Sequence, residues 1–323
     1  QNTSDQWQGR TVYDSSQSLG KVWGARIGDI DPDRPGDEPY ILTEEGAFDV
    51  GQGYFAQPIG NEWVSSMVYN AQVGMDCAIG EINTDSPGNE IIVGTEMGPV
   101  YEITPQPDNT KGLWPSQTLW NDFDNAPWVV QIADVLPDQP GNEVIYGTRY
   151  NNRIRMSHPS SDGAGHDVET LFTGQNNEDP LNMWDIAVGD VLPASDTLEI
   201  VGVDGTGSVY LVHYNGSEWI GETLWQDTNG ATYAVVIADF LPQDPGEEII
   251  AAGASGKVVL ISQDSCPIGD LNCDESVDVN DLLALLGDWG PCDNVCPPNC
   301  VGDLNEDCTI DVNDLLALLA NWG

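Results

Sequence analysis

One segment of the 323-residue chain recurs five times at a nearly constant interval. Each copy contains an acidic residue, a turn rich in Pro, Asp and Gly, and a glutamate nine positions after that acid. The acids are Asp29, Glu81, Asp134, Asp190 and Asp239, spaced 52, 53, 56 and 49 residues apart, and the glutamates are Glu38, Glu90, Glu143, Glu199 and Glu248. A period of this length restricts the fold to repeat architectures in which each copy is one supersecondary unit.

Each copy has the pattern of β-strands. An alternating apolar stretch precedes the turn, and a β-branched run such as Ile91-Ile92-Val93 follows it. A second alternating run and a closing segment such as SQTLW or GETLW complete the copy. Four strands in about 50 residues match one blade of a β-propeller. The sequence therefore predicts a mainly β, five-bladed propeller over residues 1–263, with an open β-solenoid as the alternative.

The two ends of the repeat region predict how the ring closes. The fifth copy stops after Ile261 without a closing segment, whereas QGRTVY at residues 8–13 resembles the closing segments and precedes the first copy. We expect this N-terminal segment to supply the outer strand of the last blade, because a closed ring has no open sheet edge. An open solenoid gives no reason for a displaced strand at each end.

The acidic turns resemble those of FG-GAP-type propeller repeats, over about 260 residues of the chain. In that family, alternate carboxylates of the turn bind calcium, which prefers oxygen ligands. The resemblance implies a site in the first copy made of Asp29, Asp31, Asp33 and Asp37, and a weaker one in the second made of Glu81, Asn83, Asp85 and Asn89. Later copies lose a ligand to Leu136, Leu192 and Leu241. The alternative is that the acid and the later glutamate only accept hydrogen bonds within the turn.

The composition excludes several classes of partner and indicates the compartment. With 53 acidic and 9 basic residues the net charge is −44, which disfavours nucleic acid and anionic membranes. No apolar run approaches the roughly 20 residues that a membrane span needs. Six of the seven cysteines follow residue 265, as in a disulfide-rich module from an oxidising compartment. Since Gln1 follows no Met or leader segment, we expect a mature, secreted, extracellular product.

A second domain is predicted over residues 264–323, where GDLNCDESVDVNDLLALLGDWG is followed by GDLNEDCTIDVNDLLALLANWG. Oxygen-bearing groups fill positions 1, 3, 5, 7, 9 and 12 of an EF-hand-like loop in both copies. The first set is Asp270, Asn272, Asp274, Ser276, Asp278 and Asp281, and the second is Asp303, Asn305, Asp307, Thr309, Asp311 and Asp314. Carboxylates this close repel one another without a cation, so we predict one Ca²⁺ in each loop.

Each loop runs into leucines at helical spacing, which predicts one amphipathic helix per copy. Two loop–helix units in tandem resemble a dockerin, the calcium-dependent module that docks on cohesin domains. The resemblance implies partner contacts at Val279, Asn280, Val312 and Asn313. Position 6 of such loops is usually Gly, because the backbone turns there with φ often positive. Glu275 and Cys308 stand there instead, which departs from the pattern.

The cysteines leave alternatives open. The six at Cys266, Cys273, Cys292, Cys296, Cys300 and Cys308 allow 15 pairings, and the sequence does not choose among them. A zinc site fits less well, because this region contains no His. Cys77 is expected to be a buried, inert thiol in a strand of the second blade.

Basic and aromatic residues also depart from an even distribution. Arg149, Arg153 and Arg155 fall within seven positions, which indicates either a docking patch for an acidic surface or a solvated edge strand. The tryptophans at equivalent places in the repeats are expected in the core between blades: Trp23, Trp128 and Trp184, with Trp120 and Trp225. Sugar stacking is an alternative for Trp63 and Trp219, which fall in variable segments.

The motifs favour binding over catalysis. The three histidines form no triad, no nucleophile elbow or phosphate loop is present, and most acids recur in every repeat. We therefore expect a secreted, non-catalytic binding or assembly protein whose calcium-loaded tail docks on a cohesin-like domain or on another copy of the chain. The alternatives are a subunit of an extracellular fibre assembling head to tail, and a carbohydrate-active enzyme or lectin anchored by the dockerin-like module.

Overall fold

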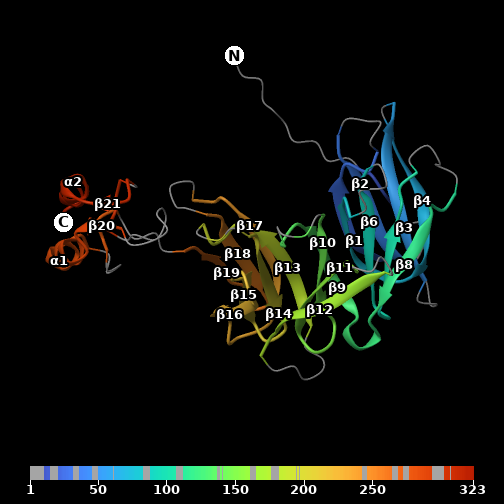
Figure 1. Cartoon of the computed structure of the whole chain (residues 1–323). Helices are drawn as coiled ribbons and strands as arrows, with labels where there is room; N and C mark the ends of the chain where they lie inside the picture. The colour runs from blue at the N-terminus through green and yellow to red at the C-terminus, as the bar shows by residue number, and fades with distance from the viewer. Residues whose placement is uncertain are drawn as a thin grey trace, which may run out of the picture. The chain divides into compact units, whose positions relative to one another are not determined.

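A computed structural model shows a mainly β chain with six antiparallel sheets and two α-helices in the residues it describes (Figure 1). Those residues are 11–14, 21–31, 36–45, 50–60, 62–82, 88–106, 112–136, 139, 141–160, 165–175, 182–193, 195, 197–241, 246–263, 268–271, 276–292, 302–305 and 307–323. The chain divides into two compact units. The larger comprises residues 1–191, 197–238 and 247–261, and the smaller comprises 192–196, 239–246 and 262–323.

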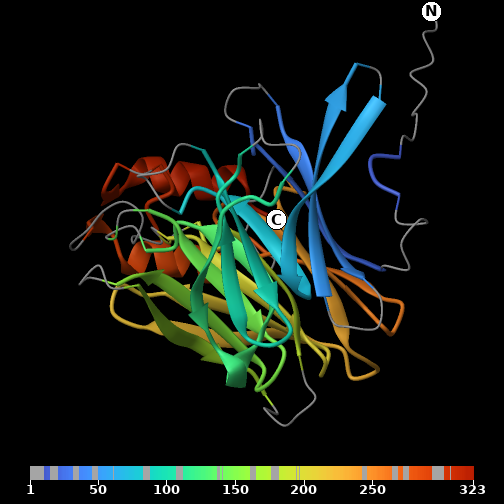
Figure 2. The same ribbon diagram turned by 90° about the vertical axis from the view of Figure 1, so that its right-hand side faces the viewer.

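The larger unit contains one sheet for each repeat, and the strands of each sheet follow chain order. The first sheet consists of β1 (Lys21–Gly28), β2 (Glu38–Glu45), β3 (Val50–Ile59) and β4 (Glu62–Gln72). The second consists of β5 (Gly74–Gly80), β6 (Glu90–Thr95), β7 (Pro99–Ile103) and β8 (Ser116–Asn121). β3 and β4 are the longest strands, and their hairpin extends beyond β2 (Figure 2).

The other three sheets repeat this plan. The third consists of β9 (Pro127–Ala133), β10 (Glu143–Thr148), β11 (Arg153–Pro159) and β12 (His166–Thr173). The fourth consists of β13 (Met183–Gly189), β14 (Glu199–Asp204), β15 (Ser208–Tyr214) and β16 (Trp219–Gln226). The fifth has three strands in the described residues: β17 (Thr232–Ala238), β18 (Glu248–Gly253) and β19 (Val258–Ile261). The predicted four-strand unit is thus found in four of the five repeats.

The first strands of the sheets lie side by side in chain order: β1 against β5, β5 against β9, β9 against β13, and β13 against β17. Each of the five carries a β-bulge where it pairs with the second strand of its sheet. The side chains between sheets are apolar. Ile30, Leu42, Phe55, Ile91 and Val93 share one buried cluster, and Cys77 within it is a free, buried thiol, as expected.

The N-terminal segment does not form the expected closing strand in its described part. Thr11–Asp14 belong to no strand, and the Tyr13 ring lies 4.6 Å from that of Tyr54 on β3 of the first sheet. An aromatic contact to the first sheet therefore replaces the predicted pairing with the fifth sheet at this residue. Residues 8–10 of the predicted strand lie outside the described residues.

The recurring glutamate opens the second strand of every sheet, and its side chain is buried in all five copies, with at most 6% exposed. In four copies its Oε2 accepts the backbone N–H of the residue after the acidic anchor. The donors are Ile30 at 3.2 Å, Ile82 at 3.1 Å, and Val135 and Val191 at 3.0 Å. For this glutamate the structure supports the hydrogen-bonding interpretation of the repeat.

The residue before the glutamate links one repeat to the previous one. Asn89 Nδ2 donates to the carbonyl of Asp29 at 2.8 Å, and Asn142 Nδ2 donates to that of Glu81 at 2.7 Å. Glu247 accepts the N–H of Asp190 at 2.8 Å and donates its own N–H to the Asp190 carbonyl at 2.7 Å. These bonds fix neighbouring sheets at the same level.

The smaller unit contains α1 (Val279–Gly287) and α2 (Val312–Ala320), which lie beside each other (Figure 2), with a short pair of strands, β20 (Gly290–Pro291) and β21 (Thr309–Ile310). Asp278 and Asp311 cap the helices, and the N3 residues Asp281 and Asp314 complete both capping boxes. The predicted helix in each copy is confirmed. Among the described residues, no helix is long and apolar enough to cross a membrane.

We expect replacement of Glu143 by Ala to destabilise the larger unit, because it leaves the buried N–H of Val135 without its acceptor. An orphaned buried donor costs about 1–3 kcal/mol. Glu143→Gln retains an acceptor oxygen and should cost less. Urea unfolding measures the difference, with the exposed Glu169→Ala on β12 as control. Equal midpoints for Glu143→Ala and Glu169→Ala would contradict the role assigned to this hydrogen bond.

Candidate functional site

The second predicted calcium loop is curled by its own side chains. Asp303 accepts the N–H of Asp307 at 3.1 Å and that of Cys308 at 2.7 Å. Asn305 accepts the N–H of Asp307 at 3.0 Å, and Asp307 accepts that of Thr309 at 3.0 Å. The residues at positions 1, 3 and 5 thus turn back onto the loop backbone, as short polar side chains do in Asx turns.

The last predicted ligand of each loop is fully buried and ties the loop to its helix. Asp314 accepts the N–H groups of Leu304 at 2.8 Å and of Asp311 at 2.7 Å. Asp281 accepts those of Leu271 and Asp278, both at 2.7 Å. The two copies therefore share one geometry in their described parts.

Cys308 adopts the conformation that usually requires Gly at position 6. Its φ is +67°, in the left-handed region, and the bond from its N–H to Asp303 holds it there. Cys292 and Cys308 lie on paired backbone, because the N–H of Cys292 donates to the Cys308 carbonyl at 3.1 Å. Cys266, Cys273, Cys296, Cys300 and Glu275 lie outside the described residues, so the pairing stays open.

Calcium remains a prediction for all the loops. Within the described part of the chain, no group of three or more His, Cys, Asp or Glu side chains is placed to hold a metal. Asn272 and Asp274 of the first loop, and Asp33 of the first repeat, lie outside that part. In the first repeat Asp31 is buried, Asp29 and Asp37 are exposed, and burial raises the pKa of neighbouring Glu38.

Both helices expose a matched apolar face. The side chains recur at a separation of 33 residues and are each 45–62% exposed: Val279, Leu283, Leu286 and Trp289, then Val312, Leu316, Leu319 and Trp322. Spacings of four and three residues place the first three of each set on one helix face. Asn280 and Asn313, predicted with Val279 and Val312 as contact residues, are exposed at the start of the same helices. We call these two sets the helix faces.

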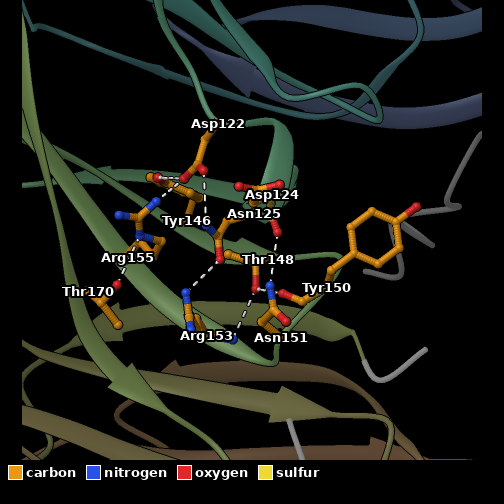
Figure 3. Close-up of polar contacts among 10 residues, drawn as sticks. All are labelled: Asp122, Asp124, Asn125, Tyr146, Thr148, Tyr150, Asn151, Arg153, Arg155 and Thr170. Atoms are coloured by element: carbon orange, nitrogen blue, oxygen red, sulfur yellow. Dashed lines mark hydrogen bonds and ion pairs between the residues drawn. The ribbon is translucent and has the colours of Figure 1, made fainter. Parts of the chain in front are cut away.

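The arginine cluster of the third sheet is engaged within the chain (Figure 3). Arg155 forms an ion pair with Asp122, which also accepts the Tyr146 hydroxyl at 2.9 Å, and its Nε donates to Thr170 at 3.1 Å. Arg153 donates to Asn125 Oδ1 at 3.0 Å. Burial lowers the pKa of Arg155, and the pairing with Asp122 occupies its guanidinium.

Arg149 is likewise occupied, by an ion pair with Glu96 and by the face of Trp128 at 5.1 Å. The prediction of a docking patch at Arg149, Arg153 and Arg155 is therefore not supported. These side chains fasten the third sheet to the second, because Glu96 and Asp122 directly follow strands β6 and β8.

A pocket of about 270 Å³ lies among the first strands of the sheets. We call it the inner pocket; its lining includes Trp23, Arg26, Met75, Asp76, Trp128, Trp184 and Asp185. Trp23, Trp128 and Trp184 were expected in the core between blades, and the structure places them in the pocket wall instead.

Two carboxylates of the inner pocket are held firmly. Asp76 receives Arg26 Nη2 on both oxygens, at 2.7 and 2.8 Å, and the N–H of Val130 at 3.1 Å. Burial raises the pKa of Asp76 to about 6, although Arg26 opposes the shift. Asp185 accepts the N–H groups of Ile186 and Val235, each at 3.0 Å, and burial raises its pKa as well.

The sequence contains a signal for this pocket that the repeat analysis did not use. The residue six positions before each acidic anchor is aromatic in four copies, and the next position is Gly24, Asp76, Val129, Asp185 or Ala234. Asp76 and Asp185 thus interrupt a position that is otherwise small or apolar. A charge that breaks a repeat at such a position marks a candidate site.

Comparisons with known proteins identify no family. No protein-family profile matches the chain, and no characterised protein matches its sequence. Two solved structures titled BBS1N in complex with ARL6DN, one soaked with lead and one with mercury, resemble it at a TM-score of 0.45. Their sequences are 14% and 15% identical to it, and the alignments cover 79% of this chain and 66% of those chains. This chain therefore spans slightly less than two thirds of their length.

The raised pKa of Asp76 predicts a pH dependence of stability. The folded state binds this proton more tightly than the unfolded state, so the contribution is present below about pH 4 and is lost as pH rises through 6. Two pH units are worth on the order of 3 kcal/mol at most. We expect the Tm, measured with chelator present, to fall between pH 5 and 7.

The variant Asp76→Asn, which does not titrate, should reduce that fall, whereas the exposed Asp167→Asn on β12 should not. The net charge of −44 contributes in the same direction in all three proteins, so the comparison isolates Asp76. Identical pH profiles for the wild type and Asp76→Asn would contradict the assignment.

Proposed function

We propose that this chain is a secreted, non-catalytic binding or assembly protein that docks on a protein partner through its C-terminal module. The observation that carries the proposal is the matched pair of helix faces, with eight large apolar side chains left open to solvent. Contiguous exposed apolar surface on a highly charged protein is typical of a protein–protein contact. Because the two faces carry the same residues, the module offers two similar orientations to one partner.

We further propose that Ca²⁺ organises the module. The donor set fits a hard cation, because every position is a carboxylate, amide, hydroxyl or backbone oxygen. The second ion would lie among Asp303, Asn305, Asp307, Thr309, Asp311 and Asp314, and the first among Asp270, Asn272, Asp274, Ser276, Asp278 and Asp281. The left-handed Cys308 and the buried Asp281 and Asp314 support this assignment, and the ion would offset the mutual repulsion of the carboxylates. Asp29, Asp31, Asp33 and Asp37 are proposed as a weaker site.

The partner that fits is a cohesin-like domain or a second copy of this chain. A contact made by Val, Leu and Trp needs an apolar acceptor, and the charge of −44 disfavours an acidic one. Two copies of the chain repel each other because both are strongly negative. Bound Ca²⁺ reduces this charge and should therefore favour self-association. A heterotypic partner avoids the repulsion and is our first choice.

We also propose that the five sheets are the blades of a closed ring. Their first strands neighbour one another in order, and hydrogen bonds link repeats at matching positions. Val258 and Leu260 of β19 are 70% and 49% exposed, which is costly for an edge strand that nothing covers. Thr11–Asp14 do not pair with this edge, so the N-terminal closing strand stays a prediction, which is tested below.

A non-catalytic role agrees with the two carboxylates of the inner pocket. Asp76 is committed to Arg26 and to a backbone N–H, and both oxygens of Asp185 accept backbone N–H groups. Groups held in this way position a ligand more readily than they exchange protons with it.

The docking proposal is tested by light scattering and negative-stain images of the full chain in calcium and in excess chelator, together with binding to a panel of immobilised cohesin domains. We expect calcium-dependent polymers or cohesin binding. The double variant Leu283→Asp and Leu316→Asp should weaken polymer formation or cohesin binding at least tenfold. Its affinity for calcium should stay unchanged. Leu113→Asp, on a leucine of the larger unit that is 51% exposed, is the control. A monomer that binds no cohesin, or docking that survives the double variant, would refute the proposal.

Ring closure is tested by hydrogen exchange on a chain lacking residues 1–14. If the N-terminal segment covers β19, the amides of Val258–Ile261 should exchange faster in the truncated chain. If the segment only contacts the first sheet through Tyr13, the change should be confined to β3. The second result would exclude the closing strand.

A further inference from the structure

We propose that the inner pocket binds a neutral saccharide, as a site separate from the docking module and independent of its function. The argument starts with the β-bulges of the first strands. In each sheet, one residue of the first strand is skipped in the pairing with the second strand. The skipped residues are Trp23, Met75, Trp128, Trp184 and Tyr233.

A bulge re-aims the side chain of its extra residue, and bulges are common next to binding sites. Four of these five side chains line the pocket, and the fifth, Tyr233, packs edge-on against Trp184 at 5.3 Å. Because the bulge occurs at the same position of each first strand, it places aromatic residues from separate repeats at the same height along neighbouring strands. A core position would not need such a bulge to bury its side chain.

The rings leave apolar surface open to a ligand. Trp128 and Trp184 meet at 86° with centroids 5.7 Å apart, and Trp184 and Tyr233 meet at 90°. In this edge-to-face arrangement successive rings turn their faces in different directions, so they do not stack on one another. Trp23 is 43% exposed and Tyr233 is 49% exposed. A flat ligand with an apolar face can cover this surface.

The polar groups of the pocket are fixed before any ligand arrives. The Arg26–Asp76 pair and the two backbone bonds of Asp185 hold both carboxylates in place. Each carboxylate oxygen has two lone pairs, and each oxygen of Asp185 accepts one of these N–H groups. Asp185 therefore keeps acceptor capacity for the hydroxyl groups of a ligand, next to an aromatic wall.

The charges select a neutral ligand. A protein of net charge −44 repels anions. Cations find the faces of two rings already occupied, by Arg149 over Trp128 at 5.1 Å and by Lys21 over Trp23 at 5.7 Å. A sugar ring satisfies both restrictions, because it combines an apolar C–H face with hydroxyl donors and carries no charge.

The size of the pocket limits the ligand further. Its volume of 270 Å³ lies just below the roughly 300 Å³ at which small-molecule sites begin. The pocket thus suits the terminal or side-chain sugar of a glycan better than a long stretch of polysaccharide. A terminal sugar and a side-chain sugar of a glycan present the same chemistry to the pocket.

The test is calorimetric titration of the full chain with neutral tetrasaccharides of glucose, xylose and N-acetylglucosamine, with choline and trigalacturonate as charged probes. We expect at least one neutral probe to bind. Trp23→Ala should weaken that binding tenfold or more, and Asp185→Asn should weaken it as well. Trp289→Ala removes a tryptophan of nearly equal exposure from the smaller unit and should have no effect.

Three results would overturn the proposal: binding of choline or trigalacturonate in preference to every neutral probe, no binding of any neutral probe, and binding that is unchanged in Trp23→Ala. Because Trp23 is exposed, its removal should leave the Tm nearly unchanged, so a loss of binding in a folded variant is interpretable. Trp184→Leu provides a second variant inside the pocket. The docking measurements use other residues, so failure of either proposal leaves the other standing.

Discussion

The larger unit depends on one buried interaction, the glutamate carboxylate that accepts a backbone N–H at the end of the first strand. Burying a carboxylate is unfavourable, and burial raises the pKa of Glu38 and Glu143 accordingly. The penalty is tolerated because the carboxylate joins the start of the second strand to the residue after the acidic anchor, across a turn that could otherwise adopt many conformations. In four of the five copies this bond therefore ties together the two strand ends that flank the turn.

This constraint extends from the turn to the pocket. Once the end of each first strand is fixed at the anchor, the position six residues earlier lies at the same level in every sheet, and there each strand bulges. The hydrogen bonds of Asn89 and Asn142 to the preceding repeats keep the sheets in step. The hydrogen bond of the recurring glutamate thereby helps to bring aromatic side chains from separate repeats together. Asp76 and Asp185 then break the symmetry, which a binding site for one ligand requires.

The sequence predicts what depends on local pattern. The repeats predicted the strand units, and the leucine spacing predicted both helices. Prediction from the sequence fails where contacts between residues far apart in the chain determine the structure. Arg155 is 33 residues from Asp122 in sequence, so the ion pair between them cannot be inferred from the sequence. From the sequence alone, the arginine cluster therefore resembles a docking patch. Tyr13 contacts Tyr54 through an aromatic pairing that no periodicity reports. The bulges at the tryptophans are equally hidden, because a strand with one extra residue still alternates on either side of it.

The acidic surface connects these features. With so few basic residues, the chain places Arg26, Arg149 and Arg155 beside carboxylates of the larger unit, and these arginine side chains are 15–35% exposed. Partial burial makes such a pairing stronger than on the open surface. Little positive charge is then left for attracting partners. Our proposals therefore have recognition rely on apolar contact at the helix faces, on an uncharged ligand in the inner pocket, and on a metal cation in the loops. Residues 264–323 contain no Lys or Arg, so this region offers its two acidic loops no positive side chain of its own. For this reason we propose calcium as a structural requirement of the docking module, and its removal should loosen the loops before it affects the sheets.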